Sequence, residues 1–372
     1  MRGICAIGIG GRGTVIVFAS SNKNKVNFLE EFEVKIPLKE NSFLDYLYNN
    51  SEIFEQRIKE KDSTLRIEKV FLVLPCEEIK KSIVEDTILL KKYKKISYKD
   101  IVFAKKNLED IFLSLEDVCL HHFNLEFEIE KNIYNTFPIG VFAKKIKLKS
   151  QLIYIKQEQY KRAKELIDSW EKEFGGVLAY PVGIFKYIQK NKNFVMIDIL
   201  YDKTYVLIYN EGIFEWIVLE DLSLKKIFEN VQRHFSIPST LVEEIFDRYV
   251  SFKEIYDSGE INIKKENDYV NLSIQSLNNF IKDYIKEKIA NILEILNSKF
   301  SEEFLVSVTG ELNKKERFFN FIHNFIPQIS INRNSMVFNC LDYSAERFLE
   351  RVPPRFRNSF LNYILNIYKD YF

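Results

Sequence analysis

Three alternating apolar segments open the chain. Residues 4–10, 14–19 and 31–36 each have the pattern of a β-strand, and glycines and the polar run SSNKNK separate them. Residues 42–61 then have the apolar spacing of a helix, and EKVFLVLP is typical of a buried strand that ends at Pro75. The pattern therefore predicts a β-meander, a helix and a further strand.

The same order returns in the second half of the chain. FVMIDIL, YVLIYN and IFEWIVL, within 194–219, predict a second meander with turns at YDKT and at Glu211-Gly212. Residues 223–299 are mostly helical in pattern, with a lysine-rich, loop-like stretch near 256–268. EFLVSVTG predicts another buried strand, and helices follow it, the last of which begins at Pro353-Pro354. The layout of the N-terminal part thus repeats, although its residues do not.

A smaller α+β unit is predicted between the two parts of the first half. The segment ISYKDIVFAKKNLEDIFLSLE has Ser97 at the position of a helix N-cap and apolar residues at helical spacing. FNLEFEIE and VFAKKIKLKSQLIYIK have the pattern of strands, and a helix is predicted over 157–174. We therefore expect residues 77–156 to form an insertion.

Composition limits the classes of protein to consider. A chain of 372 residues with 46% hydrophobic and 29% charged residues is typical of a globular protein, and its length predicts two or more lobes. The net charge of +1 gives no overall field that would attract nucleic acid or an anionic membrane. The four cysteines lie far apart without CxxC spacing, which predicts neither a zinc site nor a disulfide framework and favours a reducing cytoplasm. The sequence shows no secretory signal and no long uncharged apolar stretch, so we expect no membrane span.

Four short motifs follow one another in an order that is known from a family. They are ISYKDI at 96–101, PIG at 138–140, IDI at 197–199 with Thr204, and VTG at 308–310. With the two meander-and-helix units, they resemble the actin-like ATPase superfamily, and within it most resemble FtsA, the bacterial division protein that links cytoskeletal filaments to the membrane. PilM, a pilus-assembly relative, has a similar layout and is the close alternative.

The resemblance implies an α/β protein with a two-lobed actin-like (ribonuclease H-like) fold and a small α+β subdomain inserted in the first lobe. It divides the chain into a first-lobe core at 1–76 and 157–190, the inserted subdomain at 77–156, a second-lobe core at 191–238 and 300–372, and a helical second-lobe subdomain at 239–299.

In this superfamily a nucleotide lies between the lobes, with a glycine hairpin from each lobe around its phosphates and an aspartate in each hairpin that positions Mg²⁺ and water. Glycines let backbone N–H groups approach phosphates, and carboxylates hold the metal. The first pattern, Asp-Ile-Gly-Thr, corresponds here to Gly8, Ile9, Gly10 and Gly11, so the carboxylate is missing. Arg12, at the tip, could contact a phosphate directly, although a solvent-exposed turn residue is the favoured interpretation.

The second hairpin has lost its glycines. The family pattern Asp-Ile-Gly-Gly-Gly-Thr-Thr keeps Asp198 and Thr204, but Leu200, Tyr201 and Asp202 stand in place of the three glycines. The bulkier side chains predict weaker access of backbone N–H groups to a phosphate.

The motifs on the adenosine side are altered as well. Thr-Gly-Gly-Gly becomes Thr309, Gly310, Glu311 and Leu312, and Glu311 would place a carboxylate beside an anionic ligand. A helix motif keeps Glu243 but has lost its lysine. The predicted vestigial nucleotide site consists of Gly10, Gly11, Arg12, Asp198, Thr204, Glu243 and Gly310. We expect ATP hydrolysis to be lost and the binding of ATP and Mg²⁺ to be weakened or lost, and we assign no catalytic residue and no metal ligand.

Two other sets of residues have a simple interpretation. His121 and His122 are adjacent, so they point in different directions, and polar residues at the end of a helix are favoured over a metal site. The lysine runs KKYKK at 91–95 and NKKER at 313–317 could touch nucleic acid or lipid, but short runs of this kind usually mark a solvated face.

The C-terminal segment RFRNSFLNYILNIYKDYF has an amphipathic helical pattern. FtsA proteins end in an amphipathic membrane anchor, and the alternative is the last core helix of the second lobe, which the small number of basic residues favours. The apolar face contains Phe356, Phe360, Tyr363, Ile364, Ile367, Tyr368 and Tyr371.

The resemblance implies a non-catalytic FtsA-like division scaffold or filament-forming adaptor, cytoplasmic and peripheral at the inner face of the membrane. Expected partners are an FtsZ-like tubulin on the helical second-lobe subdomain, other division proteins or a neighbouring copy on the insertion, and the membrane surface; nucleic acid is not expected. The alternatives are a PilM-like adaptor of pilus or secretion assembly and an active ATPase or small-molecule kinase that uses Asp198.

Overall fold

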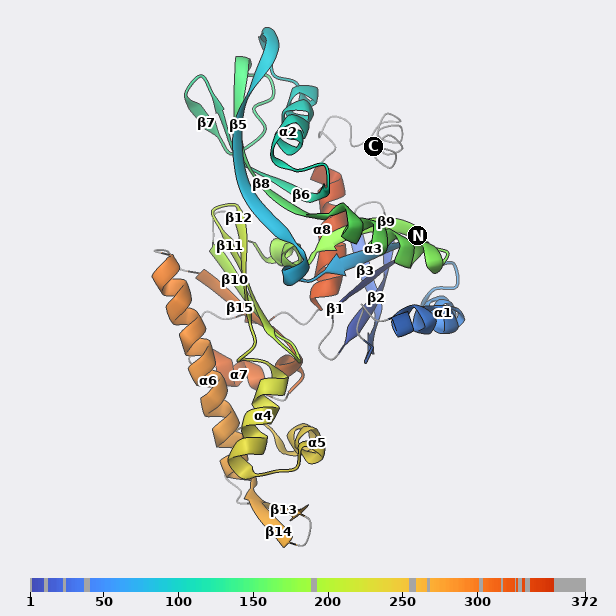
Figure 1. Cartoon of the computed structure of the whole chain (residues 1–372), viewed down its shortest axis with the longest axis vertical. Coiled ribbons are helices and arrows are strands. Elements are labelled where there is room, and N and C mark those ends of the chain that lie inside the picture. The colour runs from blue at the N-terminus through green and yellow to red at the C-terminus, as the bar shows by residue number, and fades with distance from the viewer. Residues whose placement is uncertain are drawn as a thin grey trace.

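The protein is described by a computed structural model (Figure 1). It describes residues 2–9, 13–22, 25–36, 41–188, 193–253, 259–265, 268–300, 304–315, 317–324, 326, 330–331 and 335–350.

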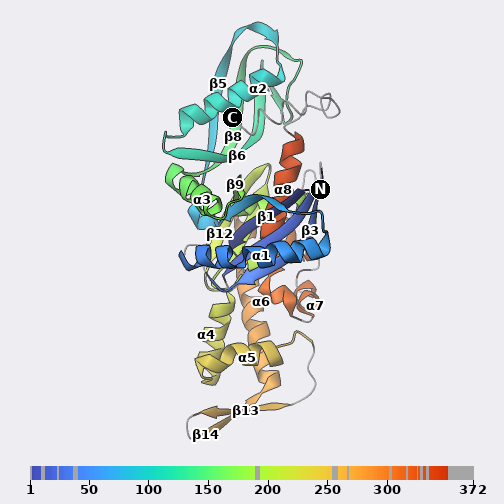
Figure 2. The ribbon, with the colours of Figure 1, turned by 90° about the vertical axis from the view of Figure 1, so that its right-hand side faces the viewer.

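The first lobe is built on a five-stranded sheet with the order β3-β2-β1-β4-β9. The first three strands form the predicted antiparallel meander, and the next two run parallel to the first. The strands are β1 (Arg2–Ile9), β2 (Thr14–Asn22), β3 (Lys25–Val34), β4 (Ile67–Leu74) and β9 (Glu173–Ala179). Helices α1 (Asn41–Lys61) and α3 (Gln157–Ser169) belong to this lobe, with α1 on its outer side (Figure 2).

The second lobe repeats this arrangement with different residues. Its sheet has the order β12-β11-β10-β15-β16, again with an antiparallel meander followed by two parallel strands. The strands are β10 (Asn193–Ile199), β11 (Thr204–Asn210), β12 (Ile213–Leu219), β15 (Phe304–Gly310) and β16 (Ser330–Ile331). Every residue of β10 is buried, as expected for the central strand of a sheet covered on both faces.

Helices form the far part of the second lobe. They are α4 (Leu224–Phe235), α5 (Ser239–Tyr249), the long α6 (Ile274–Lys299) and the short α7 (Phe318–His323). The stretch near 256–268, predicted to be a loop, contains strand β13 (Glu260–Lys265), which pairs with β14 (Asp268–Ser273). The prediction was wrong there because Ile261, Ile263, Val270 and Leu272 alternate within a polar, lysine-rich context that hides the period of two.

The predicted insertion is a separate four-stranded antiparallel sheet with one helix. Its order is β5-β8-β6-β7, and α2 (Tyr98–Phe112) lies on one face. Ser97 is the N-cap of α2, as predicted, and its backbone N–H donates to Asp100 Oδ2 at 2.9 Å. The strands are β5 (Lys80–Lys95), β6 (Asp117–Ile129), β7 (Asn132–Tyr134) and β8 (Phe142–Lys156). The insertion and the β13–β14 hairpin lie at opposite ends of the long axis (Figure 1).

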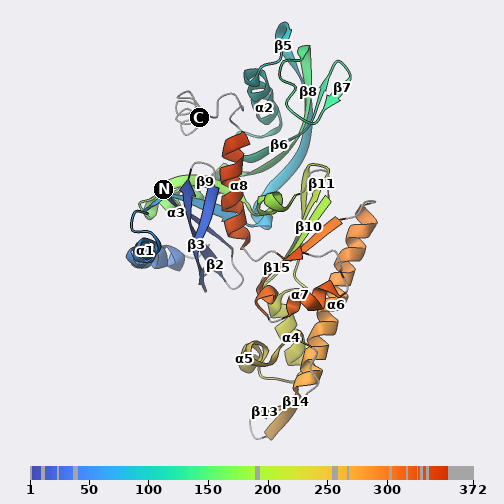
Figure 3. The ribbon, with the colours of Figure 1, turned by 180° about the vertical axis from the view of Figure 1, so that it is seen from behind.

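Helix α8 (Met336–Glu350) differs from the predicted division of the chain. The segment 300–372 was assigned to the second-lobe core, but α8 lies along the first-lobe sheet (Figure 3), where Met336, Val337 and Leu341 join its hydrophobic core. The helical period shows that α8 has an apolar face, but it contains no information about which sheet that face meets.

Candidate functional site

The Asp198 carboxyl group lies at the junction of the two lobes. Asp198 is on β10 of the second lobe and is only 2% exposed. Tyr180, in a 3-10 helix (Tyr180–Tyr187) that follows β9 of the first lobe, donates its hydroxyl hydrogen to Asp198 Oδ2 at 2.5 Å. Tyr180 is itself buried, and its ring lies 5.1 Å from that of Tyr205. A first-lobe side chain therefore covers the carboxylate that the sequence placed in the nucleotide site.

Burial controls the charge of Asp198. It raises the pKa of the carboxyl group from 3.8 to about 7, the hydrogen bond from Tyr180 opposes this rise, and the negative charge of Glu311 adds to it. Near neutral pH the carboxyl group is thus divided between its protonated and ionised forms.

Glu77 holds the neighbouring turn of the second lobe. It follows β4 in the first lobe and accepts a hydrogen bond from the Tyr205 hydroxyl at 2.7 Å. It also forms an ion pair with Lys203, which lies between β10 and β11. Burial alone would raise the pKa of Glu77, but the bonds from Lys203 and Tyr205 outweigh it and lower the pKa. The only cation of the second hairpin's turn, residues 200–203, is therefore directed to a protein carboxylate.

The residues at the positions where the resemblance predicts glycines have structural roles. Leu200 is buried in the core that joins the lobes, and the Tyr201 ring lies 6.1 Å from that of Phe228 in the second-lobe core. Thr204 is fully buried, and its hydroxyl donates to the carbonyl oxygen of Leu222. Both predicted residues of this hairpin, Asp198 and Thr204, are thus hydrogen-bonded within the protein.

Close packing explains the glycines that remain on either side of the junction. Gly310 has a φ of +97°, and a Cβ at this position would lie 2.2 Å from the carbonyl oxygen of Ile199 on β10. A Cβ on Gly8 would lie 2.7 Å from Val337 Cγ2 of α8. The contacts of β15 with β10 and of α8 with β1 therefore require glycine at these positions.

Acidic residues of β3 lie close to the residues that follow β15. Glu311 forms an ion pair with Lys314 at 2.7 Å, and Lys314 Nζ also lies 3.6 Å from Glu33 of the first lobe. Burial raises the pKa of Glu31 next to them, with a smaller opposing effect from its hydrogen bond with Ser335. Lys314 thus bridges the lobes.

A further contact joins the insertion to the second lobe. The Gln151 side chain of β8 donates from Nε2 to the carbonyl oxygen of Phe214 at 2.6 Å and accepts from its N–H at 2.8 Å. The Phe123 ring of β6 lies 4.5 Å from that of Phe214. One buried amide therefore satisfies both backbone groups of a β12 residue.

The other predicted residues do not join this cluster. Glu243 lies half-buried on α5, within the helical part of the second lobe. Gly10, Gly11 and Arg12 lie outside the described residues, as does the predicted C-terminal apolar face with Phe356, Phe360, Ile364, Ile367, Tyr368 and Tyr371.

His121 and His122 lie in strand β6, so their placement at the end of a helix was wrong. His121 Nε2 accepts from the backbone N–H of Ala179 at 3.0 Å, and His122 Nδ1 lies 2.6 Å from Glu109 Oε1 of α2. Within the described part of the chain, no group of three or more His, Cys, Asp or Glu residues could hold a metal ion, and all four cysteines are free.

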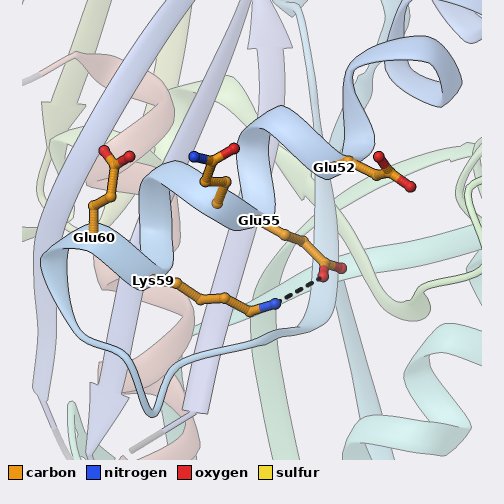
Figure 4. Close-up of a pocket in the computed structure, with 5 residues that line it drawn as sticks. Glu52, Glu55, Lys59 and Glu60 are labelled. Carbon is orange, nitrogen blue, oxygen red and sulfur yellow. Dashed lines mark ion pairs between the residues drawn. The ribbon is translucent and has the colours of Figure 1, made fainter.

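A hollow of about 560 Å³ lies along α1 (Figure 4). Its lining residues, Glu52, Glu55, Gln56, Lys59 and Glu60, all come from this helix, and Lys59 lies 3.9 Å from Glu55. Side chains from one helix do not enclose a ligand, so we assign no function to it.

Sequence reasoning missed Tyr180, Glu77 and Gln151. Tyr180 lies 18 residues from Asp198, and Glu77 lies 128 residues from Tyr205. The available signal was that Asp198 stands in a segment without the glycines that the resemblance predicts, which indicates another partner for this carboxylate.

Comparisons with solved structures identify the fold of this chain. No family model and no curated protein matches this chain by sequence. Among solved structures, the PilM–PilN type IV pilus biogenesis complex matches 94% of this chain and 99% of its own, with 14% identity and a TM-score of 0.51. MreB5 of Spiroplasma citri bound to ADP matches 96% and 99%, with 10% identity and a TM-score of 0.49. A non-polymerising mutant of MamK bound to AMPPNP matches 94% and 99%, with 9% identity and a TM-score of 0.45. The chain therefore has the two-lobed fold of the actin-like ATPases, with an α+β subdomain inserted in its first lobe.

Proposed function

We propose that this protein is a non-catalytic actin-like adaptor, a pseudo-ATPase whose interlobe site now holds the two lobes together. The hydrogen bond between Tyr180 and Asp198 carries this proposal, because it joins the lobes through the carboxylate that would otherwise face a metal ion.

The residues at the junction do not fit Mg²⁺ and a nucleotide. Asp198 is buried and already bonded, Lys203 is paired with Glu77, and Glu311 adds negative charge near the expected adenosine side. A polyphosphate placed here would lie beside carboxylates whose neighbouring cations, Lys203 and Lys314, are already paired with Glu77 and Glu311, which opposes binding.

The contacts between the lobes support a rigid scaffold rather than a nucleotide-driven hinge. Glu77 with Lys203, Glu33 with Lys314 and Gln151 with the Phe214 backbone join the second lobe to the first lobe or its insertion at three places. Opening the lobes would expose these polar groups and the hydrophobic core they share, which costs free energy without a ligand to offset it.

Two adaptor roles follow from different observations. The similarity to PilM in its complex with PilN supports a role in pilus or secretion assembly, in which the chain binds a short segment of a membrane partner. The ordered motifs ISYKDI, PIG and VTG support an FtsA-like division scaffold that binds an FtsZ-like tubulin, forms filaments and lies at the inner face of the membrane. No helix in the described part of the chain is long and apolar enough to cross a membrane.

Nucleotide binding and turnover test the pseudo-ATPase proposal. We expect the purified chain to give no calorimetric signal with millimolar Mg-ATP and no phosphate release. The same two assays compare Tyr180→Phe with Tyr187→Phe. The first variant removes only the hydroxyl that covers Asp198, and the second removes the hydroxyl that bonds Asn339 and is the matched control. Micromolar Mg-ATP affinity with turnover by the unmodified chain would instead establish the active ATPase or kinase.

Partner binding separates the two adaptor roles. Co-sedimentation with an FtsZ-like polymer is expected of the division scaffold, and binding of a cytoplasmic peptide from a pilus membrane protein is expected of the assembly adaptor. A neighbouring gene for an FtsZ-like tubulin would support the division scaffold, and neighbouring pilus genes would support the assembly adaptor.

A further inference from the structure

Exposed hydrophobic side chains gather on the inserted subdomain. Most of the large exposed hydrophobic residues in the described part of the chain belong to it, although it is a minor part of the protein. Leu89 is 71% exposed, Tyr93 62% and Phe142 49%, and all three belong to β5 and β8. The insertion forms one end of the molecule (Figure 1), so these side chains lie far from the helical part of the second lobe.

The pairing of β5 with β8 brings these residues together. Lys95 lies opposite Phe142, and Leu89 lies opposite Lys145, with an irregularity of the ladder between Leu89 and Lys94. The rings of Tyr93 and Phe142 are stacked, with centroids 5.6 Å apart and planes 20° apart. Lys95 Nζ lies 5.4 Å from the centroid of the Phe142 ring. We call residues 89–95 and 139–145 the basic tip.

The basic tip is strongly positive although the whole chain is nearly neutral. Its two segments, LLKKYKK and IGVFAKK, contain six lysines and no acidic residue. Lys94 is paired with Asp100 at 2.6 Å. Among the described residues, no ion pair involves Lys91, Lys92, Lys144 or Lys145, all of which are exposed.

The adjoining part of the same sheet shows the contrast. Lys147 lies 2.8 Å from Glu85 and 3.3 Å from Glu128, so its charge is compensated by carboxylates on both neighbouring strands. This part of the sheet resembles an ordinary solvated surface. The positive charge and the exposed apolar side chains therefore coincide at the tip.

We propose that the basic tip binds the surface of an anionic lipid bilayer. Lysines near a negatively charged membrane are attracted to its headgroups, and tyrosine, phenylalanine and leucine side chains partition into the interfacial region below them. A protein partner that covered the basic tip would bury its lysines without counter-charges, and buried unpaired charges are costly.

The arrangement favours lipid over nucleic acid. Stacking on bases requires free aromatic faces, and the stacking of Tyr93 on Phe142 covers one face of each ring. Leu89 and Ile139, which is 51% exposed, present aliphatic surface. Aliphatic side chains do not stack on bases, but their burial in a bilayer interface is favourable.

This inference goes beyond the adaptor function and does not depend on it. It assigns membrane contact to the basic tip, and this contact requires neither the C-terminal segment nor a bound nucleotide. Its test therefore needs neither ATP nor a protein partner.

Co-sedimentation of the full chain with vesicles tests the proposal. The vesicles contain phosphatidylcholine alone or with about one third phosphatidylglycerol, at low and high salt. We expect binding only to the anionic vesicles, weakened by salt. Lys91→Gln with Lys92→Gln is expected to weaken it about 25-fold, since each basic residue near the surface contributes about fivefold.

Matched variants distinguish the tip from general charge. Lys161→Gln with Lys164→Gln removes the same charge from exposed positions of α3 and is expected to leave binding unchanged. Leu89→Ser with Tyr93→Ser alters only side chains that are mostly exposed, and we expect it to weaken binding while the melting curve stays the same. Wild-type affinity in both tip variants, or tight binding of a single-stranded nucleic acid without binding to anionic vesicles, would overturn the proposal.

Discussion

Replacing Asp198 by Asn should stabilise this protein at neutral and alkaline pH. The buried carboxyl group has its pKa raised from 3.8 to about 7, so the folded state holds a proton more tightly than the unfolded chain does. For such a group, the stabilising contribution is complete below the unfolded pKa and is lost as the pH rises through the folded pKa.

The size of the effect follows from the two pKa values. A rise from 3.8 to about 7 corresponds to roughly 4 kcal/mol between the protonated and the ionised carboxyl group in the folded state. Asn resembles the protonated form and can still accept the hydrogen bond from Tyr180. The stability difference between Asp198→Asn and the unmodified chain is therefore expected to be near zero at about pH 4 and to level off near 4 kcal/mol above about pH 7.

Urea unfolding of both proteins between these pH values measures this difference, and other titrating groups cancel in it. A difference that does not change with pH, or a loss of stability in Asp198→Asn at pH 8, would refute the reasoning. Either result would mean that the carboxylate is solvated or paired with a cation in the folded protein.

Two further changes test the contacts between elements. Gln151→Leu leaves the Phe214 N–H and carbonyl groups without their partner, so we expect urea unfolding to show a loss of about 3 kcal/mol and hydrogen exchange at Phe214 to accelerate, whereas the exposed change Gln56→Leu should have little effect. Gly8→Ala places a methyl group 2.7 Å from Val337 Cγ2 and is expected to lower stability by about 2 kcal/mol. Adding Val337→Ala to Gly8→Ala removes the clashing methyl group, so the two losses should be less than additive; full additivity in thermal unfolding would contradict the proposed contact.

Much of the fold was accessible from local patterns. The two meanders, the helix over 42–61 and the N-cap at Ser97 depend on side-chain alternation, helical spacing and capping chemistry within short segments. The hairpin of β13 and β14 was missed because charged residues interrupt its alternation. The site was only partly accessible, because its motifs identify which residues are retained or lost but not what they contact.

From the sequence, the family resemblance predicts a first hairpin with Gly8 in place of an aspartate, and a second hairpin that keeps Asp198 but has no glycines. Three features became known from the packed lobes: Tyr180 covers Asp198, Lys203 is paired with Glu77, and α8 packs on the first lobe. Each of these contacts joins elements that belong to different lobes or are far apart in the sequence. Their geometry depends on how two complete sheets pack together, which no local period or motif spacing encodes.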